Sequence, residues 1–329
     1  MKVSDSIDLI TSTSYANFRE KALEVYRYQY HHLPSLQLFM RLTGFDPEWP
    51  QNQNTWPFLP ISFFKTTELK TTEGEAEIQF FSSSTTGKGA SRHAVHSLAV
   101  YEHSFRSAWR LFYPEPEALC VLCLLPSYLE RDGSSLIYMA EDFLKRSSDA
   151  DSGFFLYEHD ALFNVLQKKK QEGKATLLLG VSYALLDFVE NHQLSDFPEL
   201  IVMETGGMKG RRKEMIREEL HAVLTAGFGV EKIHSEYGMT ELLSQAYSQG
   251  DGLFHCPPWM KVIVKDQNDP FSAPLINKRG RICIIDLANA FSCAFIETED
   301  LGIVHEDGSF EVLGRLDHSD MRGCNVMVS

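Results

Sequence analysis

The chain has 329 residues, of which 43% are apolar, so it is long enough for one large domain or two smaller ones around a substantial core. This composition argues against disorder and a disulfide scaffold, and the formal charge of -14 at pH 7 argues against nucleic-acid binding, which depends on basic surface. The N-terminus lacks the apolar stretch of a secretion signal, and the strongly apolar run at 118–125 is far shorter than the ~20 residues of a membrane span. We therefore expect a cytoplasmic protein that begins at Met1, with no stable membrane insertion.

The first third of the chain predicts helices followed by irregular chain, with a stretch rich in proline, asparagine and tryptophan at 47–60. A helix is predicted over 96–112, because large apolar residues recur there at intervals of three or four. Farther along, short apolar runs alternate with amphipathic segments. This alternation predicts strands at 119–125, 175–180, 200–203 and 232–236, and helices at 183–191 and 209–224.

Such an alternation is typical of a parallel sheet flanked by helices, in which the loops at the carboxyl ends of the strands bind ligands. From Trp259 the pattern changes to a succession of strands, predicted at 261–265, 281–287 and 309–313. We therefore predict an α/β fold with parallel sheets flanked by helices, plus a small β-rich subdomain over about 255–316.

The six cysteines include one C-x-x-C pair, Cys120 and Cys123. This pair lies inside the apolar run at 119–125, where thiols are far more often small core residues than metal ligands. We therefore propose no zinc site there. Cys324 differs, because its neighbours are polar.

Residues 80–92 bring hydroxyl groups, glycines and cations together directly after an extended apolar segment. Hydroxyl and backbone N–H groups donate to phosphate oxygens, and a cation balances their charge. Whether that cation is Lys88 or Arg92 stays open, as does the alternative of a polar surface loop. The pattern G-x-x-x-x-G-K-[ST] of the P-loop enzymes does not fit here. The candidate phosphate-binding residues are Ser83, Thr85, Thr86, Gly87 and Lys88.

A second cluster, formed by Tyr237, Gly238, Thr240 and Glu241, follows the last of the predicted parallel strands. Tyr237 suits stacking on a flat base, and Thr240 suits a hydrogen bond to phosphate. Glu241 offers the hard oxygen ligand that Mg²⁺ prefers. A buried aromatic beside a surface carboxylate is an equally good interpretation of the spacing alone.

A third pair, Asp300 and Arg315, flanks an Asp307-Gly308 hairpin turn from opposite strands. The Asp300 carboxylate could accept both hydroxyls of a ribose, and the Arg315 guanidinium could donate to the same ring. The alternative is a plain exposed ion pair, which contributes little stability.

Together and in this order, the three clusters resemble the adenylate-forming superfamily of acyl-CoA synthetases, firefly-type luciferases and peptide-synthetase adenylation domains. The resemblance implies that the chain uses ATP and Mg²⁺ to adenylate a carboxylic acid. It implies phosphate contacts from the loop at 83–88, and Mg²⁺ at Glu241. It also implies that the nucleotide meets Tyr237, Gly238, Thr240, Asp300 and Arg315, and that the adenine is flanked by Gly206 and Gly207.

Within that superfamily, the chain looks most like the acyl-protein synthetases of the bacterial luminescence fatty-acid reductase system, over about residues 79–329. The segments that carry this likeness are Leu-Pro-Ser-Tyr-Leu-Glu-Arg at 125–131, Gly-Ser-Ser-Leu at 133–136, Cys-Pro-Pro-Trp at 256–259 and Arg-Gly-Cys-Asn at 322–325. The likeness implies a fatty acid as substrate, catalytic roles for Thr240 and Glu241, and acyl transfer through Cys324. A core cysteine near the terminus is the alternative for Cys324.

Three departures from the superfamily pattern affect these expectations. Ser84 stands where many relatives have glycine, Gly89-Ala90 replaces a Pro-Lys pair, and Glu299 precedes Asp300 where glycine is usual. The sequence also ends soon after Asp317, where relatives hinge into a small domain that carries a catalytic lysine. We therefore predict a large domain at 1–316 and a truncated hinge at 317–329. Slower adenylation is expected unless Lys88, Arg92 or a partner protein substitutes for that lysine.

Several alternatives for the function stay open at this stage. The acyl group could pass to CoA, to a carrier protein or to a sugar in surface polysaccharide or lipid assembly. The chain could also be a non-catalytic nucleotide sensor. The expected partners are a small carboxylic acid and an acyl-acceptor or reductase protein. An acyl pocket would be walled by Phe80, Phe81, Tyr128, Tyr138 and Met139.

Overall fold

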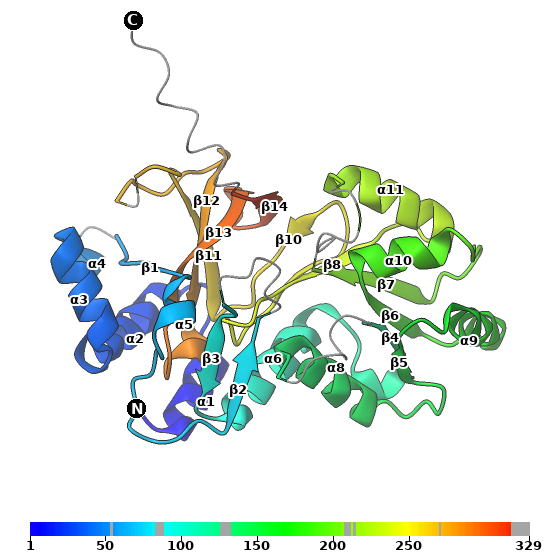
Figure 1. The fold of residues 1–329 in the computed structure, drawn as a ribbon, viewed down its shortest axis with the longest axis horizontal. Coiled ribbons are helices and arrows are strands. Elements are labelled where there is room, and N and C mark those ends of the chain that lie inside the picture. Colours follow the sequence, from blue (N-terminus) through cyan, green and yellow to red (C-terminus); the bar gives the residue numbers. More distant parts are fainter. Residues whose placement is uncertain are drawn as a thin grey trace, which may run out of the picture.

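The computed structural model describes residues 1–52, 55–82, 89–125, 133–206, 212, 215–269 and 271–316. The chain forms two large β-sheets with helices around them (Figure 1). The helices are α1 (Val3–Ser12), α2 (Phe18–His32), α3 (Pro34–Thr43), α4 (Trp49–Asn52), α5 (Phe63–Thr66), α6 (Leu98–Phe112), α8 (Ser135–Arg146), α9 (His159–Glu172), α10 (Ser182–Val189) and α11 (Arg217–Phe228). Two short 3-10 turns are η1 (Pro116–Ala118) and η2 (Leu287–Asn289).

The first sheet has the strand order β5-β4-β6-β7-β8-β9, in which every neighbouring pair is parallel except β8 with β9. Helices α10 and α11 cover one face of it, and α6 and α8 lie on the other (Figure 1). The carboxyl ends of its parallel strands therefore share one edge. Its strands are β4 (Cys120–Leu124), β5 (Gly153–Phe155), β6 (Thr176–Val181), β7 (Leu200–Thr205), β8 (His234–Tyr237) and β9 (Ala246–Ser248).

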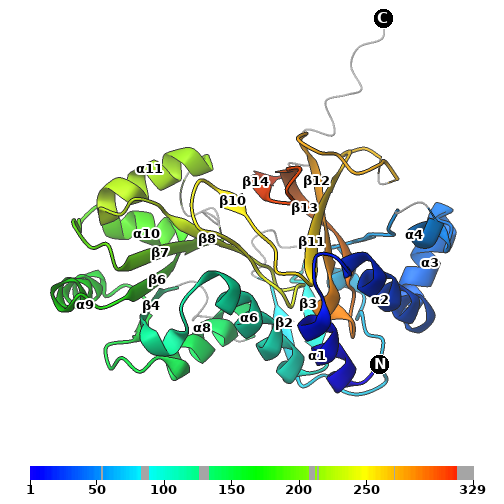
Figure 2. The same ribbon diagram turned by 180° about the vertical axis from the view of Figure 1, so that it is seen from behind.

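The second sheet has the strand order β10-β14-β13-β12-β11, with antiparallel neighbours, and β1 adds to it by pairing parallel with β13. Helices α2, α3 and α4 lie on the side of this sheet that faces away from the first sheet (Figure 2). A separate hairpin joins β2 to β3. The strands of these two groups are β1 (Leu59–Pro60), β2 (Ile78–Phe81), β3 (Arg92–Val95), β10 (Leu253–Phe254), β11 (Met260–Lys265), β12 (Gly280–Asp286), β13 (Phe295–Val304) and β14 (Phe310–Arg315).

The predicted fold class is confirmed, and every strand predicted from periodicity is present within a few residues of its expected bounds. The predicted start of the helix at 209–224 is wrong, because α11 begins at Arg217 and ends at Phe228. Ile216 has extended backbone dihedrals, and Glu218 and Glu219 then occupy the first turn, where acidic side chains favour the positive end of the helix dipole. Helices α8 and α9 have no counterpart in the prediction. The domain division at 316 stays a prediction, although the strand β1 shows that the second sheet also draws on the N-terminal segment.

Cys120 and Cys123 are fully buried in β4, as predicted for small core residues. Burial raises the pKa of the Cys120 thiol to about 12, so the group stays protonated at neutral pH. Within the described residues, no helix is both long and apolar enough to cross a bilayer.

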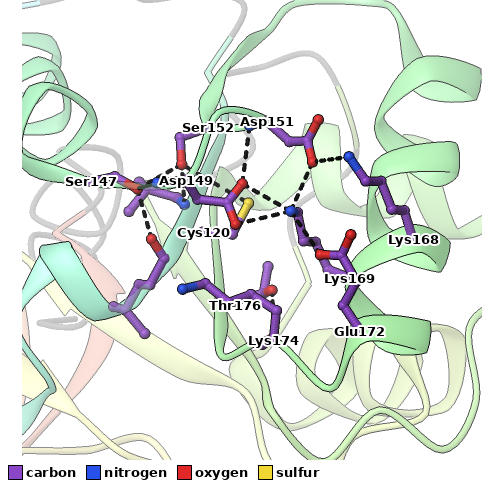
Figure 3. A network of polar contacts seen from close by, with 12 residues as sticks. Cys120, Ser147, Asp149, Asp151, Ser152, Lys168, Lys169, Glu172, Lys174 and Thr176 are labelled. Atoms are coloured by element: carbon purple, nitrogen blue, oxygen red, sulfur yellow. Dashed lines mark hydrogen bonds and ion pairs between the residues drawn. The ribbon is translucent and has the colours of Figure 1, made fainter.

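An ion network around the buried Lys169 side chain lies at the amino ends of β4 and β6 (Figure 3). This edge of the sheet is opposite the edge formed by the carboxyl ends of the same strands. The Lys169 side chain is only 4% exposed, and its Nζ lies 2.9 Å from Asp149, 2.7 Å from Asp151 and 3.0 Å from Glu172. Because each of these contacts compensates the desolvated ammonium charge, the network is structural in character.

Candidate active site

Strands β7 and β8 place the predicted glycine motif and the predicted tyrosine motif at the same edge of the first sheet. Thr205 and Glu236 are register partners in these parallel strands, so Gly206 and Tyr237 follow them side by side. Gly206 has a φ of 70°, a left-handed conformation that favours glycine, and its carbonyl accepts a hydrogen bond from Ser182 Oγ at 3.0 Å. Gly207 lies outside the described residues.

Tyr237 is buried and its ring is held edge-on between two phenylalanines. The ring centroids lie 5.9 Å from Phe254 and 5.6 Å from Phe310. The Tyr237 hydroxyl donates a hydrogen bond to Asp300 Oδ2 at 2.8 Å. Burial, reinforced by the Asp300 charge, raises the pKa of Tyr237 well above its usual value, so the hydroxyl remains a donor at neutral pH.

Asp300 and Arg315 are register partners across β13 and β14, and Arg315 Nε lies 3.5 Å from Asp300 Oδ1. The Asp300 side chain is 13% exposed whereas that of Arg315 is 80% exposed. Burial raises the pKa of Asp300, while Arg315 and the Tyr237 hydroxyl act in the opposite direction. The pair therefore consists of a largely buried carboxylate and an exposed cation, and the Tyr237 hydroxyl is the third group in this cluster. The Asp307-Gly308 turn between the two strands is present, with Gly308 at a φ of 85°.

Glu241 is 5% exposed, and no cation pairs with its carboxylate among the described side chains. Burial raises its pKa, while the Ser91 hydroxyl and the charges of Arg315 and Lys65 oppose that rise. No group of three or more His, Cys, Asp or Glu side chains is placed to hold a metal within the part of the chain that the structure describes. A single carboxylate completed by phosphate oxygens is a donor set that suits Mg²⁺, so Glu241 fits the predicted ion.

The turn that carries Thr240 and Glu241 is held by hydrogen bonds from side chains that the sequence did not indicate. His93 Nδ1 donates to the Thr240 carbonyl at 2.8 Å, and Asn289 Nδ2 donates to the Glu241 carbonyl at 2.7 Å. Asp286 accepts hydrogen bonds from the backbone N–H of the two residues at 243 and 244, at 2.8 and 3.1 Å. Burial lowers the pKa of His93 to about 4, so the ring is neutral at physiological pH and its donor atom is assigned from the carbonyl that it faces.

The N-terminal helix α2 also helps to hold this turn. Gln29 of α2 is fully buried, and its Nε2 donates to the carbonyls of Asn289 and Ala290 at 3.0 Å each. These contacts join residues separated by 260 positions or more, so no local pattern could have indicated them.

Two neighbouring buried carboxylates, Glu204 and Glu236, point to opposite faces of the first sheet at its carboxyl edge. Burial raises the pKa of Glu236 to about 7, although the hydrogen bond of 2.5 Å from Thr205 Oγ1 acts to lower it. Burial also opposes ionisation of Glu204, but His221 and Arg217 outweigh it and hold the pKa of that carboxyl at about 2. A Cβ at Gly238 would collide with Glu236 Oε1, so a larger residue in this turn would require the buried Glu236 carboxyl to move.

The candidate phosphate loop connects β2 to β3, and the structure describes only its two ends. Phe81 and Arg92 are paired across the hairpin, and Ser91 N donates to Ser82 Oγ at 2.8 Å. The Ser91 hydroxyl also lowers the pKa of the Glu241 carboxyl by hydrogen bonding. The base of the loop therefore adjoins the candidate Mg²⁺ ligand. The predicted site residues that lie outside the described residues are Ser83, Thr85, Thr86, Gly87, Lys88, Gly207 and Cys324.

The structure thus brings Tyr237, Asp300 and Arg315 into contact and places Glu241 within range of the Arg315 charge. Solved structures with the same architecture include ATP-bound MatB from Rhodopseudomonas palustris, at 20% identity and a TM-score of 0.54, over 74% of this chain and 49% of that one. The chain has their fold. No protein-family model matches the sequence, and no curated protein matches it.

Two further structures extend the comparison. The 2-hydroxyisobutyryl-CoA ligase in complex with 2-HIB-AMP is 13% identical with a TM-score of 0.67, over 91% of this chain and 67% of that one. The amide bond synthetase McbA from Marinactinospora thermotolerans is 20% identical with a TM-score of 0.51, over 76% of this chain and 51% of that one. The chain therefore spans about half the length of MatB and of McbA. At these identities the likeness shows a common fold.

Proposed function

We propose that the chain is an ATP-dependent ligase that activates a carboxylic acid as its acyl-adenylate and releases pyrophosphate. The observation that carries this proposal is the meeting of Tyr237, Asp300 and Arg315 near the Glu241 carboxylate, which no cation of the described residues pairs with, at the carboxyl edge of a parallel sheet. The fold shared with ligases and with ATP-bound MatB supports the same conclusion.

In the proposed reaction, an oxygen of the acid's carboxylate attacks the α-phosphorus of ATP. The bond from that phosphorus to the oxygen bridging toward the β-phosphate breaks, and its electron pair leaves with pyrophosphate. The protein has to hold two anions together and stabilise the growing charge, so positioning and electrostatics account for most of the rate. Asp300 is suited to accept hydrogen bonds from the ribose hydroxyls, and Arg315 is suited to donate to the same ring. Mg²⁺ bound through Glu241 would balance phosphate charge.

The loop residues Thr85, Thr86 and Gly87 are proposed as phosphate contacts, and Thr240 as a hydrogen-bond donor to the nucleotide phosphate. Ser91 at the base of that loop acts on the Glu241 carboxyl, which supports a common phosphate and Mg²⁺ site. The position of Gly206, directly after β7 and next to Tyr237, supports its proposed place beside the adenine.

We further propose a fatty acid as the substrate and transfer of its acyl group to Cys324. The Cys324 thiolate would attack the carbonyl carbon of the acyl-adenylate, the C–O bond to the phosphate would break, and AMP would leave a thioester behind. This step rests on the resemblance to acyl-protein synthetases described from the sequence. Transfer to CoA, to a carrier protein or to a sugar is the alternative, and an acceptor screen with the purified adenylate separates them.

The decisive experiment is acid-dependent exchange of labelled pyrophosphate into ATP, with acids from acetate to palmitate and with aromatic acids. We expect exchange in the wild type and a loss of at least about a hundredfold in Glu241→Gln, because a metal ligand is removed. Glu306→Gln, an exposed carboxylate at the hairpin turn, is the matched control and should exchange like the wild type. ATP binding without exchange for any acid would instead support a nucleotide sensor.

The transfer step has its own test. Cys324→Ala should leave pyrophosphate exchange unchanged and abolish a hydroxylamine-labile acyl label on the protein. A label that persists in Cys324→Ala would remove this cysteine from the mechanism while leaving adenylation in place.

A further inference from the structure

Strand β1 pairs with the first part of β13, and the segment that follows β1 heads toward the middle of β13, where Asp300 lies. Leu59 and Pro60 pair in parallel with Ile296 and Glu297, and Ile61 N donates to the Glu297 carbonyl at 2.8 Å. Because the two strands run in the same direction, the residues after Pro60 head the same way as the part of β13 that follows Glu297 and carries Asp300. The helix α5 begins there, at Phe63.

A second contact fixes α5 against the turn of the candidate site. Phe64 is 1% exposed, and its ring meets the His93 ring edge-on with centroids 5.4 Å apart. His93 in turn donates to the Thr240 carbonyl at 2.8 Å. Two independent tethers, one to the strand of Asp300 and one to the backbone of Thr240, therefore define where Lys65 lies.

Lys65 follows Phe64 directly and is partly buried. Among the described residues its side chain forms no hydrogen bond and no ion pair, although its charge is close enough to lower the pKa of the Glu241 carboxyl. Lys70, a few residues farther along, is an ordinary exposed lysine whose Nζ lies 3.6 Å from Glu68. An ammonium group that has no paired anion among the described residues is available to bind an anionic ligand.

Arg315 is a second cation whose charge acts on Glu241, and it comes from the strand β14. Lys65 and Arg315 thus approach the Glu241 carboxyl from separate elements. A triphosphate bound next to that carboxyl would carry several negative charges into this position, and a lysine is well suited to bind them as a point charge.

We propose that Lys65 is a phosphate-binding residue of this site, and that its ammonium group contacts the phosphate groups of ATP beside Glu241. The inference rests on the proposed adenylating function and adds to it a binding residue from the N-terminal segment. Lys65 forms no covalent bond in this role. It stabilises the bound triphosphate and the charge that grows on the departing pyrophosphate.

The test compares binding of ATP, by isothermal titration, with binding of adenosine, by saturation-transfer NMR, in the full chain. Lys65→Ala should weaken ATP binding by about tenfold or more, since hydrogen bonds to charged groups are among the stronger ones, and should leave adenosine binding unchanged. Lys65→Arg should restore most of the ATP affinity. Lys70→Ala, the matched control, should bind both ligands like the wild type.

The outcomes separate this inference from the proposed function. Equal ATP affinity in Lys65→Ala and in a wild type that exchanges pyrophosphate would overturn the role of Lys65 and leave adenylation standing. Loss of ATP and adenosine binding together, in Lys65→Ala and in the more isosteric Lys65→Met alike, would assign Lys65 to the structure and also overturn it. A wild type that binds no ATP at all would overturn both.

Discussion

The Tyr237 hydroxyl donates a hydrogen bond to Asp300 Oδ2 at 2.8 Å and thereby joins residues 63 positions apart in two different sheets. Tyr237 ends β8 of the first sheet, and Asp300 lies within β13 of the second. The candidate nucleotide site therefore lies at the junction of the two sheets, and its integrity depends on how they pack.

Removal of the Asp300 carboxylate should weaken ATP binding by about ten- to a hundredfold, because the ribose acceptor is lost and the buried Tyr237 hydroxyl is left without its partner. Tyr237→Phe removes only the hydroxyl and should cost less, about 0.5–1.5 kcal/mol in binding free energy. Isothermal titration of Asp300→Ala and Tyr237→Phe with ATP measures both, with Glu306→Gln as the control. Wild-type affinity in Asp300→Ala would exclude Asp300 from the nucleotide site.

His93 is a positioning residue for the Thr240 carbonyl, and its replacement should act on the turn without touching substrate. His93→Ala should lower the pyrophosphate-exchange rate by about tenfold, since one buried hydrogen bond of about 1–1.5 kcal/mol is lost at the turn, and should raise the Mg²⁺ concentration needed for half-maximal rate. His93→Gln retains an N–H donor and should recover part of the rate. An unchanged Mg²⁺ requirement in His93→Ala would limit His93 to core packing.

Glu236 should make stability depend on pH in a direction opposite to that of most carboxyl groups. Its pKa is raised by burial from 4.5 to about 7, so the folded state holds the proton more tightly than the unfolded state does. The stabilisation is complete below pH 4.5 and is lost as the pH rises through 7, by up to about 3 kcal/mol. Urea unfolding of wild type and Glu236→Gln at pH 5 and pH 8 should show the variant gaining relative stability at the higher pH. A constant difference between the two proteins would contradict this assignment.

The network around Lys169 permits a stability test far from the candidate site. Lys169→Met should destabilise the protein by about 3 kcal/mol, because it leaves the Asp149 carboxylate, which is only 10% exposed, without its cation. Lys168 is 54% exposed and forms an ion pair with Asp151, so Lys168→Met should change stability by less than about 1 kcal/mol. Both variants should bind ATP like the wild type once folded. Thermal unfolding and ATP titration check these expectations, and equal stability of the two variants would refute the structural role of Lys169.

Local patterns in the sequence were sufficient to predict the α/β class, the strands β4, β6, β7, β8, β11, β12 and β14, and the turn at Asp307-Gly308. Periodicity reports which residues of one segment face the core, so it identifies elements without their partners. The sequence also indicated Tyr237 and Glu241 in the segment after a predicted strand, and Asp300 and Arg315 on either side of the predicted hairpin turn. Their proposed roles stay predictions, as does that of Cys324.

The sequence by itself determined many of the elements and several of the chemical groups beside them, and only the tertiary structure decided which groups meet. The support from His93, Asn289 and Gln29 depends on hydrogen bonds across 147, 48 and 260 positions, respectively, for which no local signal exists. The approach of Lys65 depends on a two-residue strand that pairs with β13. These relationships arise from packing between distant segments, where the burial of apolar faces brings polar side chains together whose spacing along the chain carries no information about their contact.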